Sequence, residues 1–392
     1  MKALSKRMEH VSEALTLRIN ARAKELAGQG RKIYFFSIGE PDFPTPRNIK
    51  DAGIRAINAD FTKYTAGAGI PELRRAIARD LQDRLALPYA PGQIAVTIGG
   101  KFAIAAAVLA ACDPGDELLI PTPCFPSYID QARLAQAVPT LIPAREEEGF
   151  KIRRQDLDAH LTSRTKMLIL NTPHNPTGVV YSYEDLRPIA NFIRDNGIYV
   201  IADEVYERLL FGRLKHVSLA SFPDIFHQTF LVNSFSKTYC MTGWRIGYCA
   251  APEHLSGAVA GVQSHMNSSA NSIAQRAAVE ALSGGQKQAV EMVGVFERRR
   301  DLMVELASAV PGVTFPRPEG AFYLWLNVRE HLKGGVTASY DLSMHLLENF
   351  GLATMPGSAF GTEGYLRLSY AVSDDDVRGG MQKLKEGLEA LK

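Results

Sequence analysis

The chain of 392 residues is long enough for two or three domains, or for one large α/β domain with a smaller partner. Lys and Arg total 44 and Asp and Glu total 42, so the net charge is only +2. This balance gives no electrostatic reason to expect nucleic acid or an anionic membrane as a partner.

The four cysteines form no CxxC pair and no zinc pattern, which favours a reduced, cytoplasmic protein without a metal site. The N-terminus is charged and lacks the apolar core of a signal peptide. The longest unbroken apolar stretch, residues 102–112, has 11 residues, whereas a membrane helix needs about 20. We therefore expect a soluble protein.

Short β-branched runs alternate with helical patterns between residues 90 and 255. Several runs are apolar on both faces, as strands of a parallel sheet covered on both sides are. The alternation predicts an α/β fold, with a mostly parallel wound sheet and helices on both faces. The expected strands are residues 94–98, 117–121, 139–143, 166–170, 199–203, 229–235 and 246–250.

The segments on either side follow other patterns. Residues 290–310 have the pattern of a long polar helix, and residues 314–328 and 364–372 resemble strands. A last helix follows Ser373, an expected N-cap, with three aspartates at its positively polarised end. We expect a large domain over residues 46–289, and a smaller α+β domain from residues 1–45 and 290–392.

Polar residues collect after the expected strands, and in open α/β sheets ligands bind outside the carboxyl ends of the strands. Each feature alone has a simpler explanation, such as a tight turn, a helix cap or a solvated lysine. Their convergence on one sheet edge favours a binding site. The segments are Gly99-Gly100-Lys101, NTPHNPTG (171–178), Asp203-Glu204-Val205-Tyr206 and Ser234-Phe235-Ser236-Lys237.

This combination suits one chemistry. A Gly-Gly pair at a helix start offers backbone N–H groups to a phosphate, and Arg245 with Ser234 and Ser236 would complete the cradle. A buried Asp203 is costly unless it meets a cation such as a protonated pyridine nitrogen. Lys237, among apolar and hydroxyl groups, would have a depressed pKa and form a Schiff base. Phosphate, pyridinium and aldehyde together describe pyridoxal 5′-phosphate.

With these motifs the sequence resembles the class I aminotransferases of pyridoxal-phosphate fold type I, over nearly the whole chain. The resemblance is greatest to the bacterial branch of aspartate, aromatic and prephenate aminotransferases. Seven stretches in the expected order carry it: SIGEPDFPTP (37–46), TKYTAGAGIPELR (62–74), TIGGKFA (97–103), NTPHNPTG, ADEVYE (202–207), SFSKTYCMTGWRIGY (234–248) and YLRLSYA (365–371).

The resemblance implies roles for the matching residues. Lys237 would bind the cofactor covalently and shuttle a proton, and Asp203 would pair with the pyridinium nitrogen. Asn175 and Tyr206 would hydrogen-bond the phenolic oxygen of the cofactor. Tyr64 would reach the phosphate from a neighbouring subunit, so the active form implied is a homodimer. The other residues implied at the phosphate are Gly99, Gly100, Lys101, Ser234, Ser236 and Arg245.

The resemblance also implies that Arg367 binds the substrate α-carboxylate, helped by Asn175 and the backbone at Gly39. Within YLRLSYA, strand alternation puts Arg367 on the face opposite Leu366 and Leu368. From the pattern alone, such an arginine either pairs with a structural acid or binds a ligand anion. The resemblance favours the ligand.

Two positions depart from the pattern of aspartate-specific relatives. Phe125 would stack on the cofactor ring where tryptophan is frequent, and Leu15 precedes the expected substrate residue Thr16 where close relatives often carry serine. Both changes weaken the case for strict aspartate specificity. Lys101 either lies near the substrate side-chain carboxylate or is a solvated lysine in the first turn of its helix.

The implied function is ping-pong transamination from an L-amino acid, aspartate or an aromatic one first, to a 2-oxo acid such as 2-oxoglutarate. The alternative is a pyridoxal phosphate-dependent lyase or cyclase, such as a cysteine-S-conjugate β-lyase, because the motifs fix the cofactor and not the reaction. No GxxxxGK[ST] loop supports a nucleotide-dependent enzyme, and no GxSxG or HExxH motif supports a hydrolase.

Overall fold

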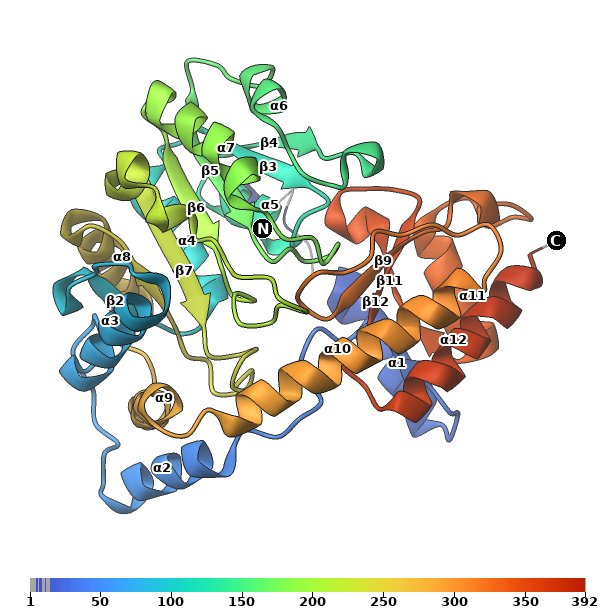
Figure 1. Ribbon diagram of the computed structural model, residues 1–392, viewed down its shortest axis with the longest axis horizontal. Helices are drawn as coiled ribbons and strands as arrows, with labels where there is room; N and C mark the ends of the chain where they lie inside the picture. The colour runs from blue at the N-terminus through green and yellow to red at the C-terminus, as the bar shows by residue number, and fades with distance from the viewer. Residues whose placement is uncertain (1–4, 6, 9–10, 12–14, 392) are drawn as a thin grey trace.

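The computed structural model describes residues 5, 7–8, 11 and 15–391, so much of the expected N-terminal segment before residue 15 lies outside the described residues. Figure 1 shows a larger and a smaller layered part, with helix α10 (Lys287–Ser308) running from one to the other. In the described ranges, no helix combines the length and the apolar character needed to cross a bilayer.

The larger part contains a seven-stranded sheet in the order β2-β8-β7-β6-β5-β3-β4. All neighbouring strands from β7 to β4 pair in parallel, whereas β8 runs antiparallel to both of its neighbours. The mostly parallel sheet expected from the sequence is therefore confirmed. Its strands are β2 (Ile94–Thr97), β3 (Glu117–Thr122), β4 (Val138–Pro143), β5 (Thr165–Asn171), β6 (Tyr199–Asp203), β7 (Thr229–Ser234) and β8 (Gly247–Ala250).

Helices cover both faces of this sheet because alternate strand residues point to opposite sides. Leu168 and Val200 belong to one buried cluster, and their neighbours Ile169 and Ile201 belong to another. Residues of α3 (Pro71–Leu85), α7 (Tyr183–Asn196) and α9 (Ser272–Ser283) complete the first cluster. Residues of α4 (Gly100–Ala111), α5 (Ser127–Leu134) and α8 (Glu253–Met266) complete the second.

The smaller part is an α+β layer that joins the two ends of the chain. The N-terminal strand β1 (Tyr34–Phe35) pairs in parallel with β10 (Leu352–Ala353). Three antiparallel strands follow the order β11-β12-β9, with bounds Met355–Pro356, Tyr365–Ser369 and Tyr323–Asn327. Around them lie α1 (Leu15–Gly28), α10, α11 (Ser339–Phe350) and α12 (Asp374–Glu389). The domain boundaries at residues 45 and 289 stay a prediction.

The strand expected over residues 314–328 is wrong over most of its length, because β9 begins only at Tyr323. Thr314 forms a single bridge to Asn327, and the chain between them carries Pro316 and Pro318. Proline has no backbone N–H to donate to a neighbouring strand, so this stretch cannot form a continuous ladder. The expected cap on α12 is present, since the Ser373 hydroxyl accepts a bond from the Asp376 N–H at 3.1 Å.

The connection between β4 and α6 (Arg154–Asp158) ties the two parts together. Glu146 accepts hydrogen bonds from Thr314 Oγ1 at 2.7 Å, Asn327 Nδ2 at 2.6 Å and the Tyr365 hydroxyl at 2.8 Å. Phe150, buried with a φ of 57°, packs edge-on against Tyr365 with ring centroids 5.6 Å apart. One carboxylate of the larger part thus holds side chains of both β9 and β12.

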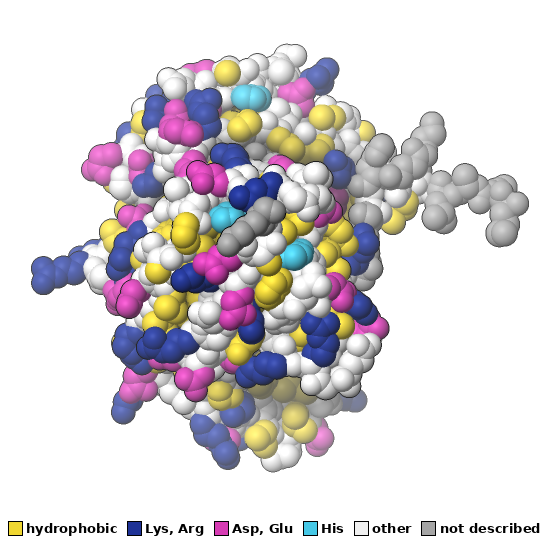
Figure 2. Space-filling model, turned by 90° about the vertical axis from the view of Figure 1, so that its right-hand side faces the viewer, with side chains coloured by type: hydrophobic (Ala, Val, Ile, Leu, Met, Phe, Trp, Pro, Cys, Tyr) yellow, Lys and Arg dark blue, Asp and Glu magenta, His cyan; other side chains and the backbone are white. Residues whose placement is uncertain are grey.

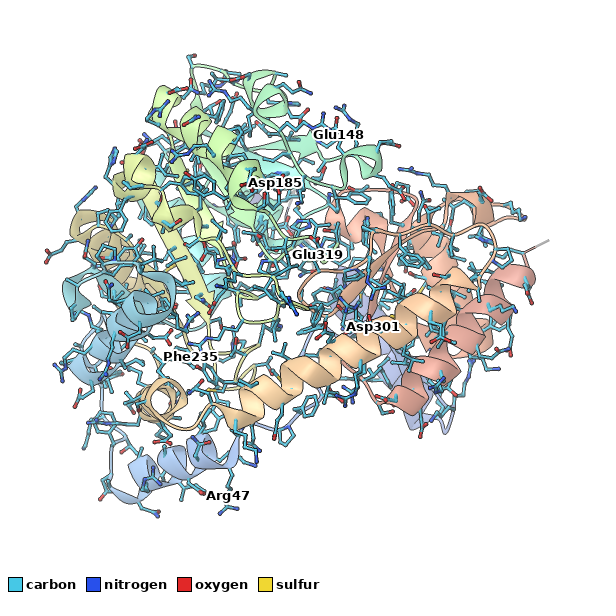
Figure 3. All side chains as sticks on the ribbon, in the orientation of Figure 1. Arg47, Glu148, Asp185, Phe235, Asp301 and Glu319 are labelled. Atoms are coloured by element: carbon cyan, nitrogen blue, oxygen red, sulfur yellow. The ribbon has the colours of Figure 1, made fainter. Side chains whose placement is uncertain are left out.

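A second tie involves the NPTG turn. The backbone N–H of Glu319 donates to the Gly178 carbonyl at 2.9 Å, and its carboxylate accepts from the Val180 N–H at 3.1 Å. Figure 3 shows Glu319 in the middle of the molecule, between the two sheets. Gly178 has a φ of +73°, and a Cβ there would lie 2.7 Å from Pro318 Cβ, so only glycine permits this approach.

Candidate active site

A cavity of about 540 Å³ opens where β5, β6 and β7 end, and residues of both parts line it. These strands pair in register, with Asn171 beside Asp203 and Asp203 beside Val232, so their carboxyl ends meet at one edge. Two of the expected residues, Gly99 and Tyr64, are outside the lining. The expected residues that line it are Thr16, Gly39, Gly100, Lys101, Phe125, Asn175, Asp203, Tyr206, Ser234, Ser236, Lys237, Arg245 and Arg367.

Asp203 is a buried carboxylate at the end of β6. It accepts hydrogen bonds from the Tyr128 hydroxyl and from the Val205 N–H, the latter at 3.3 Å. It forms no salt bridge within the described part of the chain. Burial raises its pKa to about 6, although the Tyr128 hydroxyl opposes this shift. A carboxylate in this position is stabilised by any cation that enters the cavity.

Lys237 follows the end of β7, and its Nζ donates to the Gly39 carbonyl. Burial, followed by the charge of Arg367, lowers the pKa of Lys237 to about 8. The ammonium lies 5.9 Å from the centroid of the Tyr206 ring and 5.7 Å from that of Phe322. Because a neutral amine is the nucleophile, this lowered pKa makes Lys237 reactive toward an aldehyde near neutral pH.

An anion cradle lies at the start of α4. Gly100 begins the helix, so its N–H and the helix dipole face the cavity. The Ser234 hydroxyl donates to the Ser236 hydroxyl at 2.8 Å, and Arg245 lies beside them. Gly99 has a φ of +90°, and a Cβ there would lie 2.7 Å from Arg245 Nη2. Because glycine has no side chain, Arg245 can lie close to the start of α4, where the guanidinium and the helix N-terminus can bind one phosphate.

Arg367 is a buried guanidinium on β12. Nη2 donates to the Ser37 carbonyl at 2.8 Å and Nη1 to Asn175 Oδ1 at 3.3 Å, whereas the buried Nε has no partner. No acid among the described residues forms a salt bridge with it, so the structural-acid alternative is wrong. Burial lowers the pKa of Arg367. A ligand carboxylate could supply both the counter-charge and the hydrogen-bond acceptor that this guanidinium lacks among the described residues.

Lys101 extends along the cavity wall, with its Nζ 5.2 Å from the centroid of the Phe125 ring. Partial burial and the nearby Arg245 lower the pKa of Lys101. Thr16 lies in the first turn of α1, on the same cavity. Lys101 therefore joins Lys237, Arg245 and Arg367 as a cation on the cavity, and none of the four forms a salt bridge among the described residues.

Sequence reasoning missed several lining residues. Tyr128 binds Asp203 and lies three residues after Phe125, a helical spacing that was readable in PCFPSY. Asn20 lies one turn after Thr16 on α1 and accepts a bond from the Ser37 hydroxyl at 2.6 Å. Tyr323 had no such signal, because it reaches the cavity only through the pairing of β9 with β12.

These groups fit pyridoxal phosphate at its three polar positions, with the amine for the aldehyde, the acid for the ring nitrogen and the cradle for the phosphate. The fold and the cavity define a pyridoxal phosphate-dependent enzyme of fold type I.

Residues 31–384 match the family described as aminotransferase class I and II. The chain is 43% identical to the probable aspartate/prephenate aminotransferase of Aquifex aeolicus, with 100% of each covered, and 39% identical to the aspartate aminotransferase of Geobacillus stearothermophilus, with 99% of each covered. The aspartate aminotransferase structure from Rhizobium meliloti matches with a TM-score of 0.95 at 35% identity, covering 99% of both chains. That from Thermus thermophilus with maleate gives 0.93 at 36%, covering 99% of this chain and 100% of the other.

The chain belongs to the class I and II aminotransferases. It is a pyridoxal phosphate-dependent transaminase, the first of the chemistries that the sequence left open.

Proposed function

We propose that this transaminase moves the amino group of aspartate to a 2-oxo acid such as 2-oxoglutarate. The observation that carries the proposal is that two of the four cations on the cavity, Arg367 and Lys101, remain after Lys237 is assigned to the aldehyde and Arg245 to the phosphate. Neither has a salt-bridge partner among the described residues. Two cations suit a dicarboxylate, with the α-carboxylate on Arg367 and the side-chain carboxylate on Lys101. Relatives named as aspartate aminotransferases support the same choice.

Aromatic and prephenate-type substrates are the second candidate. Leu17, Ile104, Phe125 and Phe360 give the cavity apolar wall area on which a ring can pack. The relative from Aquifex aeolicus is named for both aspartate and prephenate.

When bound, pyridoxal phosphate supplies an aldehyde that captures amino groups and a ring that withdraws electrons from the substrate α-carbon. Asp203 would hold the proton on the ring nitrogen, because its buried charge forms no salt bridge with any cation among the described residues. Lys237 takes up and releases the transferred proton at Nζ, for which a pKa of about 8 is suited. Tyr206, Asn175 and Phe125 line the same cavity. Tyr206 and Asn175 would bind the phenolic oxygen, and Phe125 would pack against the ring.

Arg367, Asn175 and the backbone at Gly39 orient the substrate α-carboxylate. Gly39 approaches Arg367 closely, since a Cβ at this position would lie 3.6 Å from both Nη atoms. The N–H groups of Gly100 and Lys101, together with Ser234, Ser236 and Arg245, hold the phosphate.

We also infer that the active form is a cytoplasmic homodimer. Tyr64, expected at a partner's phosphate, is 90% exposed, and Ile57 and Met266 are 51% and 62% exposed. Their exposure leaves these side chains available for contact with a second chain. The described cysteines are all unpaired, as in a reducing compartment.

Light scattering gives the oligomeric state. Tyr64→Phe should weaken cofactor binding if the tyrosine hydroxyl reaches a partner's phosphate.

The test is a panel of amino donors with 2-oxoglutarate, measured for the wild type, Lys101→Met and Lys237→Ala. Lys101→Met should reduce kcat/KM for aspartate roughly 10- to 100-fold, the worth of one charge-assisted bond, and leave phenylalanine nearly unchanged. Lys287→Met, at a lysine with an 87% exposed side chain, is the matched control and should change neither. Equal losses for both donors would contradict the dicarboxylate proposal. A yellow, active Lys237→Ala enzyme would overturn the site assignment.

A further inference from the structure

Tyr323 lies between two groups of the proposed site that have separate tasks. Its hydroxyl is 2.8 Å from the hydroxyl of Tyr206, and both side chains are buried. Its ring lies under Arg367, with the guanidinium carbon 4.4 Å from the ring centroid. One side chain therefore contacts both the residue proposed for the cofactor's phenolic oxygen and the residue proposed for the substrate carboxylate.

The position of Tyr323 is fixed by its surroundings. It begins β9, whose register with β12 pairs Tyr323 with Ser369 and Trp325 with Arg367. The Tyr323 hydroxyl also lies 2.8 Å from the point where Gly39 would carry a Cβ. A larger residue at position 39 would therefore push the hydroxyl away from Tyr206. Strand pairing on one side and the bare glycine on the other leave the ring little freedom.

The direction of the hydrogen bond between the two tyrosines follows from counting protons. A phenol has one O–H donor. If Tyr206 donates its proton to the phenolic oxygen of the cofactor, its contact with Tyr323 must be one in which Tyr206 accepts. Tyr323 is available as the donor, because burial raises its pKa and keeps the hydroxyl protonated. A hydroxyl that accepts one bond donates its own more strongly, so Tyr323 reinforces the bond from Tyr206.

We propose that Tyr323 is a positioning residue for two groups of the site: its hydroxyl strengthens the hydrogen bond between Tyr206 and the cofactor, and its ring supports Arg367 for binding of the substrate carboxylate. The proposal rests on the roles proposed above for Tyr206 and Arg367. It assigns two separable tasks to one side chain. The hydroxyl acts on the cofactor through Tyr206, and the ring supports the guanidinium of Arg367.

The first task is measured by the pH midpoint of the visible band of the lysine-bound cofactor. This band changes when the lysine nitrogen loses the proton that it shares with the phenolic oxygen. A donor on that oxygen stabilises the deprotonated form, so weakening the donor raises the midpoint. Tyr206→Phe should raise it by about one to two pH units, the worth of one bond to a charged acceptor. Tyr323→Phe should raise it by roughly 0.1 to 0.6 unit, the cooperative share of that bond.

The double variant tests whether Tyr323 acts through Tyr206. Adding Tyr323→Phe to Tyr206→Phe should produce no further shift, because the hydroxyl that transmits the effect is gone. Tyr89→Phe is the matched control, since Tyr89 is a buried tyrosine that packs on Phe226 in the core of the larger part. It should leave the midpoint of the wild type unchanged, although it too removes a buried hydroxyl.

The second task is measured by the binding of maleate, a dicarboxylate, to the cofactor-loaded enzyme. Tyr323→Phe keeps the ring and should leave the Kd of maleate unchanged. Tyr323→Leu removes the ring and should raise the Kd roughly 2- to 30-fold, the range for one cation–π contact. Circular dichroism and cofactor content establish that the leucine variant is folded. If it does not fold, Tyr323→Phe and the double variant still carry the test.

The outcomes separate this inference from the function on which it depends. A midpoint that stays in place or falls in Tyr323→Phe, while Tyr206→Phe raises it, would overturn the proposed role of the Tyr323 hydroxyl and leave the site assignment standing. If Tyr323→Phe shifts the midpoint equally in the wild type and in Tyr206→Phe, the Tyr323 hydroxyl does not act through Tyr206. That result would also overturn the inference and leave the site assignment standing. If Tyr206→Phe itself leaves the midpoint unchanged, then Tyr206 does not face the phenolic oxygen, and the proposed site is wrong at that position.

Discussion

Replacing Arg84 by methionine should destabilise the protein by several kilocalories per mole, whereas the same change at Arg79 should not. Both arginines lie on α3 and pair with an aspartate four residues away. Arg84 also bonds both oxygens of Glu207 at 2.7 and 3.0 Å, and the Glu207 side chain is only 4% exposed. Arg79 and Asp83 are 84% and 64% exposed.

The magnitude follows from what each deletion leaves behind. Removing one partner of a buried ion pair costs about 3–5 kcal/mol. The low end, about 3 kcal/mol, applies here because Arg208 Nε remains 3.3 Å from Glu207 and the Arg84 side chain is 27% exposed. With about 2.1 cal/mol/K of unfolding entropy per residue, a chain of 392 residues loses roughly 4 °C in Tm. The exposed pair at Arg79 contributes at most about 0.5 kcal/mol, or less than about 1 °C.

The assay is thermal unfolding of the cofactor-loaded enzyme, followed by circular dichroism at one scan rate. A third variant, Arg84→Met with Glu207→Leu, removes the stranded carboxylate as well and should recover part of the lost stability. Asp80 keeps Arg208 as a partner in all three variants, at 2.5 Å. If Arg79→Met and Arg84→Met lower Tm by the same amount, burial does not govern these ion pairs and the reasoning fails.

Three further predictions concern the site. Asp203→Asn keeps the shape of the side chain but removes its charge, so the single-turnover rate constant should fall at least about 100-fold. A near-normal rate constant would contradict the role of the acid. Arg367→Lys replaces a planar two-pronged donor with a point charge, so kcat/KM should fall roughly 10- to 100-fold for every amino donor while the cofactor spectrum stays unchanged. Burial lowers the pKa of Lys237 to about 8, and only its neutral form attacks an aldehyde. Cofactor capture by the apoenzyme should thus accelerate with rising pH through about 8 in stopped-flow measurements. Acceleration only above pH 10 would show an ordinary lysine.

The parts of the molecule that the sequence predicted correctly depend on local information. The runs at 166–170, 199–203 and 229–235 are apolar on both faces, and they form most of β5, all of β6 and all of β7. Asp203 and Lys237 stand at or just after the ends of two such strands, and parallel pairing brings strand ends together whatever the loops do. The acid, the amine and the phosphate cradle were therefore predictable to lie on one cavity.

The parts that the sequence did not predict depend on contacts between distant segments. Tyr323 reaches the cavity because β9 pairs with β12, whose residues lie some 40 positions later, and no nearby pattern marks it. That Arg367 has no acid as a partner among the described residues could not be predicted for the same reason, since any distant carboxylate would have satisfied the pattern. The strand predicted over residues 314–328 is too long for a different, local reason. Pro316 and Pro318 lie within it, and proline has no N–H for a neighbouring strand, so β9 begins only at Tyr323.

The three hydrogen bonds that Glu146 accepts have a mechanical consequence for the substrate arginine. Tyr365 and Arg367 are two residues apart on β12 and therefore lie on the same face of the strand. Glu146 thus holds the strand through the side chain that precedes Arg367 on that face. If the smaller part turns relative to the larger while these three bonds persist, the axis of rotation must pass close to Glu146. A given angle then displaces Arg367 by less than it displaces α12, which lies on the right-hand side of the molecule in Figure 1, the side that faces the viewer in Figure 2.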